Sequence, residues 1–237
     1  MWSPAMTWAE WEPVYECIRS DFGFDRSADE AARDQLAASV GTVGMDPAEL
    51  PNATDRSAVI VGAGALSNGD VETIDRADIV ISASAATATL RDLGIESDLH
   101  VTDLDDPPGL VPQLSDEGVP LAIHAHGDNR EAIATILPQV SKSRVFPTTQ
   151  VAPVAHVFNP GGFTDGDRAA YLAHAIGAAE LRFAGWVFDD PGVDVTKRAK
   201  LGWAARLLHW LECHRGERFS ILDDRREELD IAAFPDP

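Results

Sequence analysis

The sequence predicts an α/β protein: a mostly parallel, Rossmann-like sheet with helices on both faces, preceded by an N-terminal helical segment. From residue 57 onward, short apolar runs alternate with helical stretches, as in parallel sheets that are buried on both faces. The first 55 residues show helical periodicity instead. The length of 237 residues and the hydrophobic fraction of 45% fit one large domain with an ordinary core. We therefore expect a helical extension over residues 1–55 and an α/β domain over residues 56–237.

Two helices are expected in the N-terminal extension. The first has an apolar face, because large apolar side chains recur every three or four residues at Trp8, Trp11, Tyr15 and Ile18. The second covers residues 27–40 and begins with Ser27 as its N-cap, since Glu30 follows three residues later as in a capping box. Glycines and prolines between residues 41 and 51 end it.

Six short strands are expected in the α/β domain. They are Ala58–Val61, Ile79–Ser82, Leu99–Thr102, Leu121–His124, Val145–Pro147 and Leu181–Phe183. The helical stretches are Gly69–Ala77, Ala85–Leu93, Gly109–Glu117, Asn129–Val140, Asp167–Ile176 and Thr196–His214. In an open α/β sheet, ligands bind beyond the carboxyl ends of the strands, where the strand order reverses. Polar residues that directly follow a strand are therefore candidates for a functional site.

The charge balance limits the partners of the protein. With 39 acidic and 19 basic residues and a net charge of −20, the chain has no surplus of cations for nucleic acid or an anionic membrane. No apolar run approaches the ~20 residues of a membrane span. Cys17 and Cys213 have no metal-binding spacing and are expected to be free thiols in the core. We expect a cytoplasmic protein whose oligomeric state the sequence leaves open.

A glycine-containing loop follows the first strand. Residues 59–69 read VIVGAGALSNG, so the strand runs directly into Gly62 and Gly64. Glycines allow backbone amides to approach a phosphate or a ring, which makes both residues candidates for cofactor binding. The spacing is neither that of a P-loop nor that of a dinucleotide fingerprint. A loop that needs only tight turns explains the pattern equally well.

Acidic residues follow the third strand. Asp103 and Asp105 alternate where the strand ends, which places their carboxylates on the same side of the chain. Two such carboxylates repel each other unless a hard divalent cation neutralises them, so they are candidate metal ligands. A solvated acidic turn is the structural alternative in so acidic a chain.

The fourth strand ends in the string HAHGDN. His124 and His126 are candidate ligands for a metal or donors to phosphate oxygens. Asp128 and Asn129 follow and are expected either to act on a substrate or to cap the next helix. The whole string at the end of a strand favours a functional role.

A further string, GGFTDGDR, precedes an apolar helix. Asp165 is expected to cap that helix, with Asp167 in its first turn. Capping alone does not explain two Asp residues, three nearby glycines and Arg168. The carboxylates are therefore candidate Mg²⁺ ligands, Arg168 a phosphate clamp and Thr164 a cofactor-binding residue.

Two of the three lysines of the chain begin the last long helix. Lys197 and Lys200 lie three residues apart and therefore share one helix face. Cations at a helix N-terminus oppose the helix dipole. Their position makes them candidates for binding phosphate or ATP, although a solvated helix face is the plain alternative.

Three of these strings, in this order and spacing, resemble the archaeal 6-hydroxymethyl-7,8-dihydropterin diphosphokinases, the MptE-like family. They are TDLD at residues 102–105, HAHGDN at residues 124–129 and GFTDGDR at residues 162–168. The last two are specific, and the similarity extends from about residue 58 to residue 214. The family is similar in fold to thiamine pyrophosphokinases. One departure is visible, because family members often have Gly where this chain has Asp106.

The resemblance implies that residues 56–237 form a catalytic domain that transfers pyrophosphate from ATP to the hydroxymethyl group of a dihydropterin and releases AMP. It also implies a need for Mg²⁺ and a place in folate or methanopterin synthesis. Asp128 would then orient or deprotonate the alcohol, with His126 as a substitute. Arg168, Lys197 and Lys200 would neutralise phosphate charge. The ligands of Mg²⁺ would be Asp103, Asp105, Asp165 and Asp167.

Other functions remain open at the level of the sequence. A thiamine-type pyrophosphokinase acting on another alcohol fits the same motifs, and so does a non-catalytic protein that binds a nucleotide or a pterin. Carboxylates and histidines also suit a two-metal phosphohydrolase. Trp186 and Phe188 follow the last strand and are large enough to stack on a flat ring, but packing in the core is the preferred interpretation.

The acidic composition predicts a dependence on salt. The chain has 16 Arg but only three Lys, and 25 Asp against 14 Glu, a composition that resembles that of extreme halophiles. At low ionic strength the surface charges repel one another, and salt screens this repulsion. We expect the melting temperature to rise steeply with KCl concentration. A melting temperature that is the same at low and at molar KCl would show that the protein is merely acidic.

Overall fold

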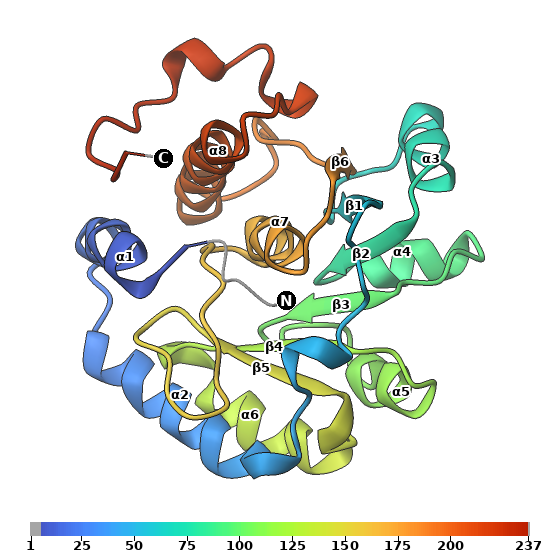
Figure 1. Ribbon diagram of the computed structural model, residues 1–237, viewed down its shortest axis with the longest axis vertical. Coiled ribbons are helices and arrows are strands. Elements are labelled where there is room, and N and C mark those ends of the chain that lie inside the picture. Colours follow the sequence, from blue (N-terminus) through green and yellow to red (C-terminus); the bar gives the residue numbers. More distant parts are fainter. Residues whose placement is uncertain (1–5, 237) are drawn as a thin grey trace.

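The computed structural model describes residues 6–236, which form an α/β fold around one six-stranded parallel sheet (Figure 1). The strand order is β5-β4-β3-β2-β1-β6. The strands are β1 Ser57–Val61, β2 Ile79–Ala83, β3 Leu99–Thr102, β4 Leu121–Ala125, β5 Val145–Thr149 and β6 Glu180–Ala184. The helices are α1 Trp8–Phe22, α2 Arg26–Val40, α3 Asn68–Asp75, α4 Ala86–Asp92, α5 Leu110–Asp116, α6 Arg130–Ile136, α7 Asp165–Ala175 and α8 Val195–Arg215. The predicted fold class is confirmed, and each predicted strand and helix has a counterpart.

Both faces of the sheet are covered because alternate strand residues point to opposite sides. Ile60, Ile81 and Val101 lie in one apolar core together with residues of α1, α7 and α8. Val59 and Val61 pack with α3 and α4 on the opposite face. Farther along that face, residues of β4 and β5 pack with α2, α5 and α6. Figure 1 shows α3, α4 and α5 on one side of the sheet and α7 on the other.

The N-terminal extension belongs to this core. In α1 the buried side chains include Trp11 and Tyr15, and Thr7 caps the helix. The cap of α2 is Asp25, whose side chain accepts from the amide of Ser27. The prediction that Ser27 is the N-cap is therefore wrong, because the helix begins at Arg26, one residue earlier than the periodicity suggested. The first five residues of the extension lie outside the described part of the chain.

The order of the strands brings polar segments together at one edge of the sheet. Strands β1 to β5 follow one another across the sheet, and the chain then returns through α7 to place β6 beside β1. Helix α7 contacts β1, β2, β3 and β6, so the helix lies over the middle of the sheet. Because all six strands are parallel, the loops after β1, β3, β4 and β6 share that edge with the start of α7.

In the described residues no helix combines the length and the apolar character that a bilayer span requires. Both cysteines are free, as expected. Cys17 is half-buried, but Cys213 is exposed near the end of α8, so its predicted place in the core is wrong.

A substitution at Gly185 tests how closely the loops after β1 and β6 pack against each other. Its φ angle is +68°, and a Cβ there would lie 2.7 Å from the carbonyl oxygen of Gly62. We expect Gly185→Ala to lower the free energy of unfolding by about 2–4 kcal/mol, through backbone strain and overpacking. Urea unfolding measures this change.

The matched control is Gly202→Ala. Gly202 lies within α8, where an added Cβ meets no atom within 4 Å. Alanine favours the helix, so this variant should gain roughly 0.5–1 kcal/mol. If Gly185→Ala unfolds at the same urea concentration as the parent protein, the close packing of β1 and β6 is not the constraint described.

Candidate active site

A cavity of about 730 Å³ lies beyond the carboxyl ends of the strands. It extends from the β1–β6 junction, where the strand order reverses, to the loop after β4. Most residues predicted for the site from sequence line it: Gly62, Gly64, Asp103, Asp105, His126, Asp128, Thr164, Asp165, Arg168, Lys197 and Lys200. His124, Asn129 and Asp167 do not, and each of them has a structural contact that accounts for its position.

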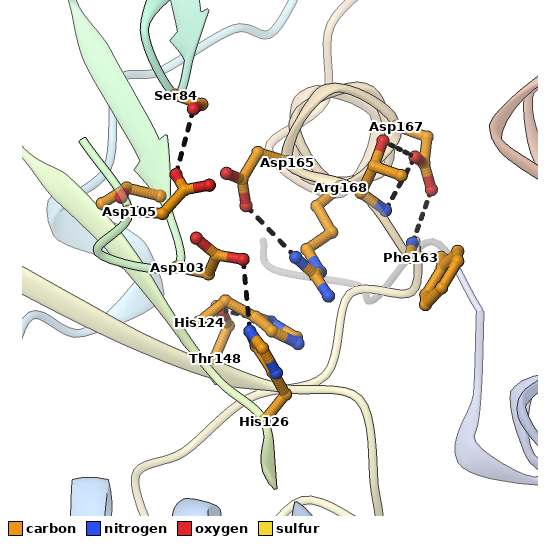
Figure 2. Close-up of polar contacts among 12 residues, drawn as sticks. Ser84, Asp103, Asp105, His124, His126, Thr148, Phe163, Asp165, Asp167 and Arg168 are labelled. Atoms are coloured by element: carbon orange, nitrogen blue, oxygen red, sulfur yellow. Dashed lines mark hydrogen bonds and ion pairs between the residues drawn. The ribbon is translucent and has the colours of Figure 1, made fainter. Parts of the chain in front are cut away.

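Three carboxylates form the centre of the site (Figure 2). Asp103 and Asp105 follow β3, and Asp165 is the first residue of α7. One oxygen from each lies within 4.8 Å of the other two. Ser84, at the end of β2, donates to Asp105 Oδ1 at 3.1 Å. One buried oxygen, Asp103 Oδ1, has no hydrogen-bond partner in the described structure.

The three carboxylates perturb one another. Burial raises the pKa of Asp103, but the hydrogen bond from His126 and the charge of Arg168 outweigh it and hold that pKa below its usual value. Burial and the charge of Asp103 raise the pKa of Asp105. The same two causes raise the pKa of Asp165 well above its usual value, although Arg168 opposes them. Three negative charges in this space therefore cost free energy until a cation joins them.

The start of α7 explains why the Asp165 carboxylate joins the cluster and the Asp167 carboxylate does not. Thr164 is the N-cap, and Asp167 completes a capping box by accepting from the amides of Phe163 and Thr164. Asp167 is fully buried, and both of its oxygens are used by these contacts. The structure therefore corrects two predictions: Asp165 is not the cap, and Asp167 does not join the cluster of carboxylates.

The HAHGDN loop orients the cluster from the side of β4. His126 Nδ1 accepts from the amide of Asp128 at 3.4 Å, which leaves its Nε2 to donate to Asp103 Oδ2 at 3.2 Å. Asn129 Nδ2 donates to the carbonyls of Asp103 and His124, and this tie joins the loops after β3 and β4. Asn129 is thus a cross-link between loops, where the sequence predicted a cofactor contact.

His124 also has a structural position. It is fully buried on β4, and its Nδ1 forms a hydrogen bond with Thr148 Oγ1 at 3.1 Å. Burial and the charge of Arg168 lower the pKa of His124 well below its usual value. The ring is therefore neutral and lies beneath the site, without lining the cavity as the sequence had predicted.

Three cations line the cavity together with the carboxylates. Arg168 is 5% exposed and donates to Asp165 Oδ1 at 3.1 Å, and its Nε has no partner within the described chain. Lys197 and Lys200 line the cavity from the first turns of α8. The Lys200 ammonium group lies 5.9 Å from the centre of the Phe163 ring. These groups are placed to balance the charge of an anion bound beside the carboxylates.

Of the two roles expected for the glycine loop after β1, the structure favours tight packing over cofactor binding. Gly62 and Gly64 line the cavity, but their amides donate to the carbonyls of Ala184 and Gly185. A Cβ on either glycine would lie within 2.8 Å of the Gly185 carbonyl oxygen. The glycines are therefore required for close packing of two loops, and their amides are not available to a phosphate.

Two walls of the cavity are formed by residues outside the predicted site. Phe24, Ala28 and Asp29, from the end of α1 and the start of α2, line one end. Trp186 lines the other end, where its indole N–H donates to the Ile60 carbonyl at 3.1 Å. Trp186 packs against Phe183 and Phe188 at the border of the core, in agreement with the preferred interpretation, and it also lines the cavity. Only the aromatic character of Trp186 and its place after a strand signalled this contact.

The carboxylate cluster fits a hard divalent cation. Carboxylate oxygens are the protein ligands that Mg²⁺ prefers, and Mg²⁺ commonly uses few of them, together with water and phosphate oxygens. The unpartnered oxygen of Asp103 and the raised pKa values of Asp105 and Asp165 are features that such an ion relieves. The residues that would hold it are Asp103, Asp105 and Asp165.

Asp105→Asn tests the repulsion within the cluster. Removing one of three neighbouring negative charges should stabilise the metal-free protein by roughly 1 kcal/mol, or about 2–4 °C in melting temperature. The same variant should lose most of the additional stabilisation that MgCl₂ gives the parent protein. Thermal unfolding with and without MgCl₂ at constant ionic strength measures both effects. Asp75→Asn, on an exposed residue of α3, is the control and should change neither. An unchanged response of Asp105→Asn to MgCl₂ would place the cation elsewhere.

Comparisons with known proteins identify the family of the chain. The family described as 6-hydroxymethylpterin diphosphokinase MptE-like matches residues 42–191. A 6-hydroxymethyl-7,8-dihydropterin pyrophosphokinase of Methanothermobacter thermautotrophicus is 35% identical over 225 residues, which cover 86% of this chain and 94% of that protein. The enzyme of the same name from Pyrococcus furiosus is 34% identical over 229 residues, with 87% and 95% covered. The chain therefore belongs to the MptE-like 6-hydroxymethylpterin diphosphokinase family.

Proposed function

We propose that this protein transfers the pyrophosphoryl group of ATP to the hydroxymethyl oxygen of 6-hydroxymethyl-7,8-dihydropterin in a Mg²⁺-dependent reaction that releases AMP. The observation that carries the proposal is the cluster of Asp103, Asp105 and Asp165 beside Arg168 in a cavity of about 730 Å³. The relatives that share most of the chain carry the name of this activity.

The charge of the protein makes the cation central to the proposal. A chain with a net charge of −20 repels ATP, and the three carboxylates would strengthen that repulsion at the point of reaction. Asp103, Asp105 and Asp165 would hold a divalent ion, whose positive charge would offset the repulsion between the carboxylates and the phosphates. Arg168, Lys197 and Lys200 line the same cavity and act on the remaining phosphate charge.

The reaction requires the alcohol oxygen to attack the β-phosphorus of ATP while the bond from that phosphorus to the oxygen of the α-phosphate breaks. Catalysis of phosphoryl transfer is mainly positioning and stabilisation of charge. Asp128 lines the cavity, and in the described structure its exposed carboxylate forms no hydrogen bond or ion pair. We assign to Asp128 the role of accepting the proton of the attacking hydroxyl group. His126 holds Asp103, which favours an orienting role over that of a base.

The walls of the cavity suit flat ring systems. Phe24 and Phe163 line one end and Trp186 the other, so the cavity offers an aromatic surface at each end. Pterin and adenine are both flat heteroaromatic rings that stack on such surfaces. The product is an alcohol activated as a diphosphate, as a downstream displacement in folate or methanopterin synthesis requires.

Product analysis tests the proposal. With ATP, MgCl₂, the dihydropterin alcohol and a high salt concentration, the nucleotide product should be AMP, formed in equal amount with pterin diphosphate. Asp103→Asn and Asp165→Asn should each reduce kcat/KM by roughly 100-fold or more, because each removes a carboxylate assigned to the cation. Asp75→Asn should keep full activity.

Other products point to other functions. Formation of ADP would indicate transfer of a single phosphoryl group, and phosphate release without the pterin would indicate a hydrolase. Turnover of thiamine in place of the pterin would indicate the related pyrophosphokinase. Full activity of Asp103→Asn would remove the carboxylate cluster from the reaction.

A further inference from the structure

The N-terminal helices contribute one buried carboxylate to the floor of the cavity. Asp29, in the first turn of α2, is 3% exposed and lines the cavity. Its Oδ1 accepts from the amide of Gly127 at 2.7 Å. Its Oδ2 accepts from the hydroxyl of Tyr15 and from Nε2 of Gln150, both at 2.8 Å. Asp29 lies outside residues 42–191, the part of the chain that matches the family.

The carboxylate of Asp29 determines which way the Gln150 amide faces. An ionised carboxylate only accepts hydrogen bonds, so Gln150 must turn its NH₂ group toward Asp29. The amide oxygen is then directed to the other side, where it accepts from Nη2 of Arg168 at 3.3 Å. The indole N–H of Trp11 donates to the backbone carbonyl of Gln150 at 2.9 Å and fixes the backbone of the same residue.

The chain of contacts continues from Arg168 to the carboxylate cluster. Nη1 of Arg168 donates to Asp165, and the guanidinium is buried. With the Gln150 amide oxygen on one side and Asp165 on the other, two of the three guanidinium nitrogens are held in place. The third, Nε, is left without a partner in the described structure.

Asp29 also locates the loop after β4. The amide that it binds belongs to Gly127, which directly follows His126, the residue that donates to Asp103. A Cβ at Gly127 would lie 2.8 Å from the Ala28 side chain, so this loop packs directly on α2.

We propose that Asp29 is a positioning residue of this active site, which orients Arg168 through the amide of Gln150 and holds His126 through the amide of Gly127. The first turn of α2 is then part of the nucleotide-binding machinery through Asp29 alone. The proposal rests on the function proposed above only in taking the bound anion to be the phosphate chain of ATP.

The test is a substitution that reverses the orientation of the Gln150 side-chain amide. In Asp29→Asn the introduced amide donates toward Gln150, so the glutamine turns its oxygen to α2 and its NH₂ group toward Arg168, where two donors then face each other. We expect the affinity for α,β-methylene-ATP with MgCl₂, measured by calorimetry, to fall about 10-fold, which is about one hydrogen bond to a charged group. kcat for pterin turnover per folded molecule should fall as well.

The double variant Asp29→Asn/Gln150→Glu exchanges the two groups and keeps the net charge. The introduced carboxylate accepts from the introduced amide and from Arg168, so binding should return to within about 3-fold of the parent protein. Gln150→Glu alone places two carboxylates together and should be the weakest binder. Recovery in the double variant is the signature of coupled neighbours, because independent effects would add.

Tyr15→Phe is the matched control. It removes a hydrogen bond to the same carboxylate oxygen but leaves the Gln150 amide facing Arg168. We expect it to lower the melting temperature while affinity and kcat stay unchanged. If Asp29→Asn does not fold, Gln150→Met interrupts the same chain of contacts one residue later and should weaken binding by a similar factor.

The binding and turnover measurements distinguish failure of the positioning role from failure of the proposed function. Parent-like affinity in Asp29→Asn, or a double variant no better than the single ones, would overturn the positioning role. If the parent protein binds the analogue tightly but does not turn over the pterin, the proposed function fails while the binding series still tests Asp29. If the parent protein does not bind the analogue, both proposals are wrong.

Discussion

The central physical constraint in this structure is the electrostatic repulsion among three carboxylates that the fold holds close together. Asp103, Asp105 and Asp165 bring oxygens within 4.8 Å of one another in a protein that already carries a net charge of −20. Such an arrangement is costly in the free protein and becomes favourable when a cation is shared among the three groups. In the proposed function, a cation held by these carboxylates would also offset the repulsion between the acidic protein and the phosphates of ATP.

The architecture supplies the rigidity that this repulsion requires. Two of the carboxylates extend from a strand that is fully buried in the middle of the sheet, and the third begins a helix that crosses that sheet. The helix start is fixed by its own capping box, in which Asp167 accepts from the backbone. Arg168, one residue later, is buried against the cluster. Within one string, Asp167 thus fixes the start of the helix, whereas Asp165 and Arg168 form part of the site.

Much of the fold and part of the site could be predicted from sequence, for identifiable reasons. Buried parallel strands appear as short apolar runs, and the rule for parallel sheets places the residues after them at one edge. Local patterns did not show that Thr164 is the N-cap of α7, because Thr164 and both Asp residues are suitable capping residues. The contact between Asp29 and Gln150 spans 121 residues and leaves no local pattern. The use of glycine amides after β1 likewise depends on β6, which is distant in sequence.

The measurement that tests the account most directly is the affinity for α,β-methylene-ATP with and without divalent cation at constant, high ionic strength. The account predicts strong binding in MgCl₂ and almost none in EDTA, because the three carboxylates repel the phosphates when no cation is shared. It also predicts that Asp105→Asn reduces the difference between the two conditions. Equal affinity with and without the cation would show that the carboxylates do not hold the nucleotide through a metal, and would contradict the account.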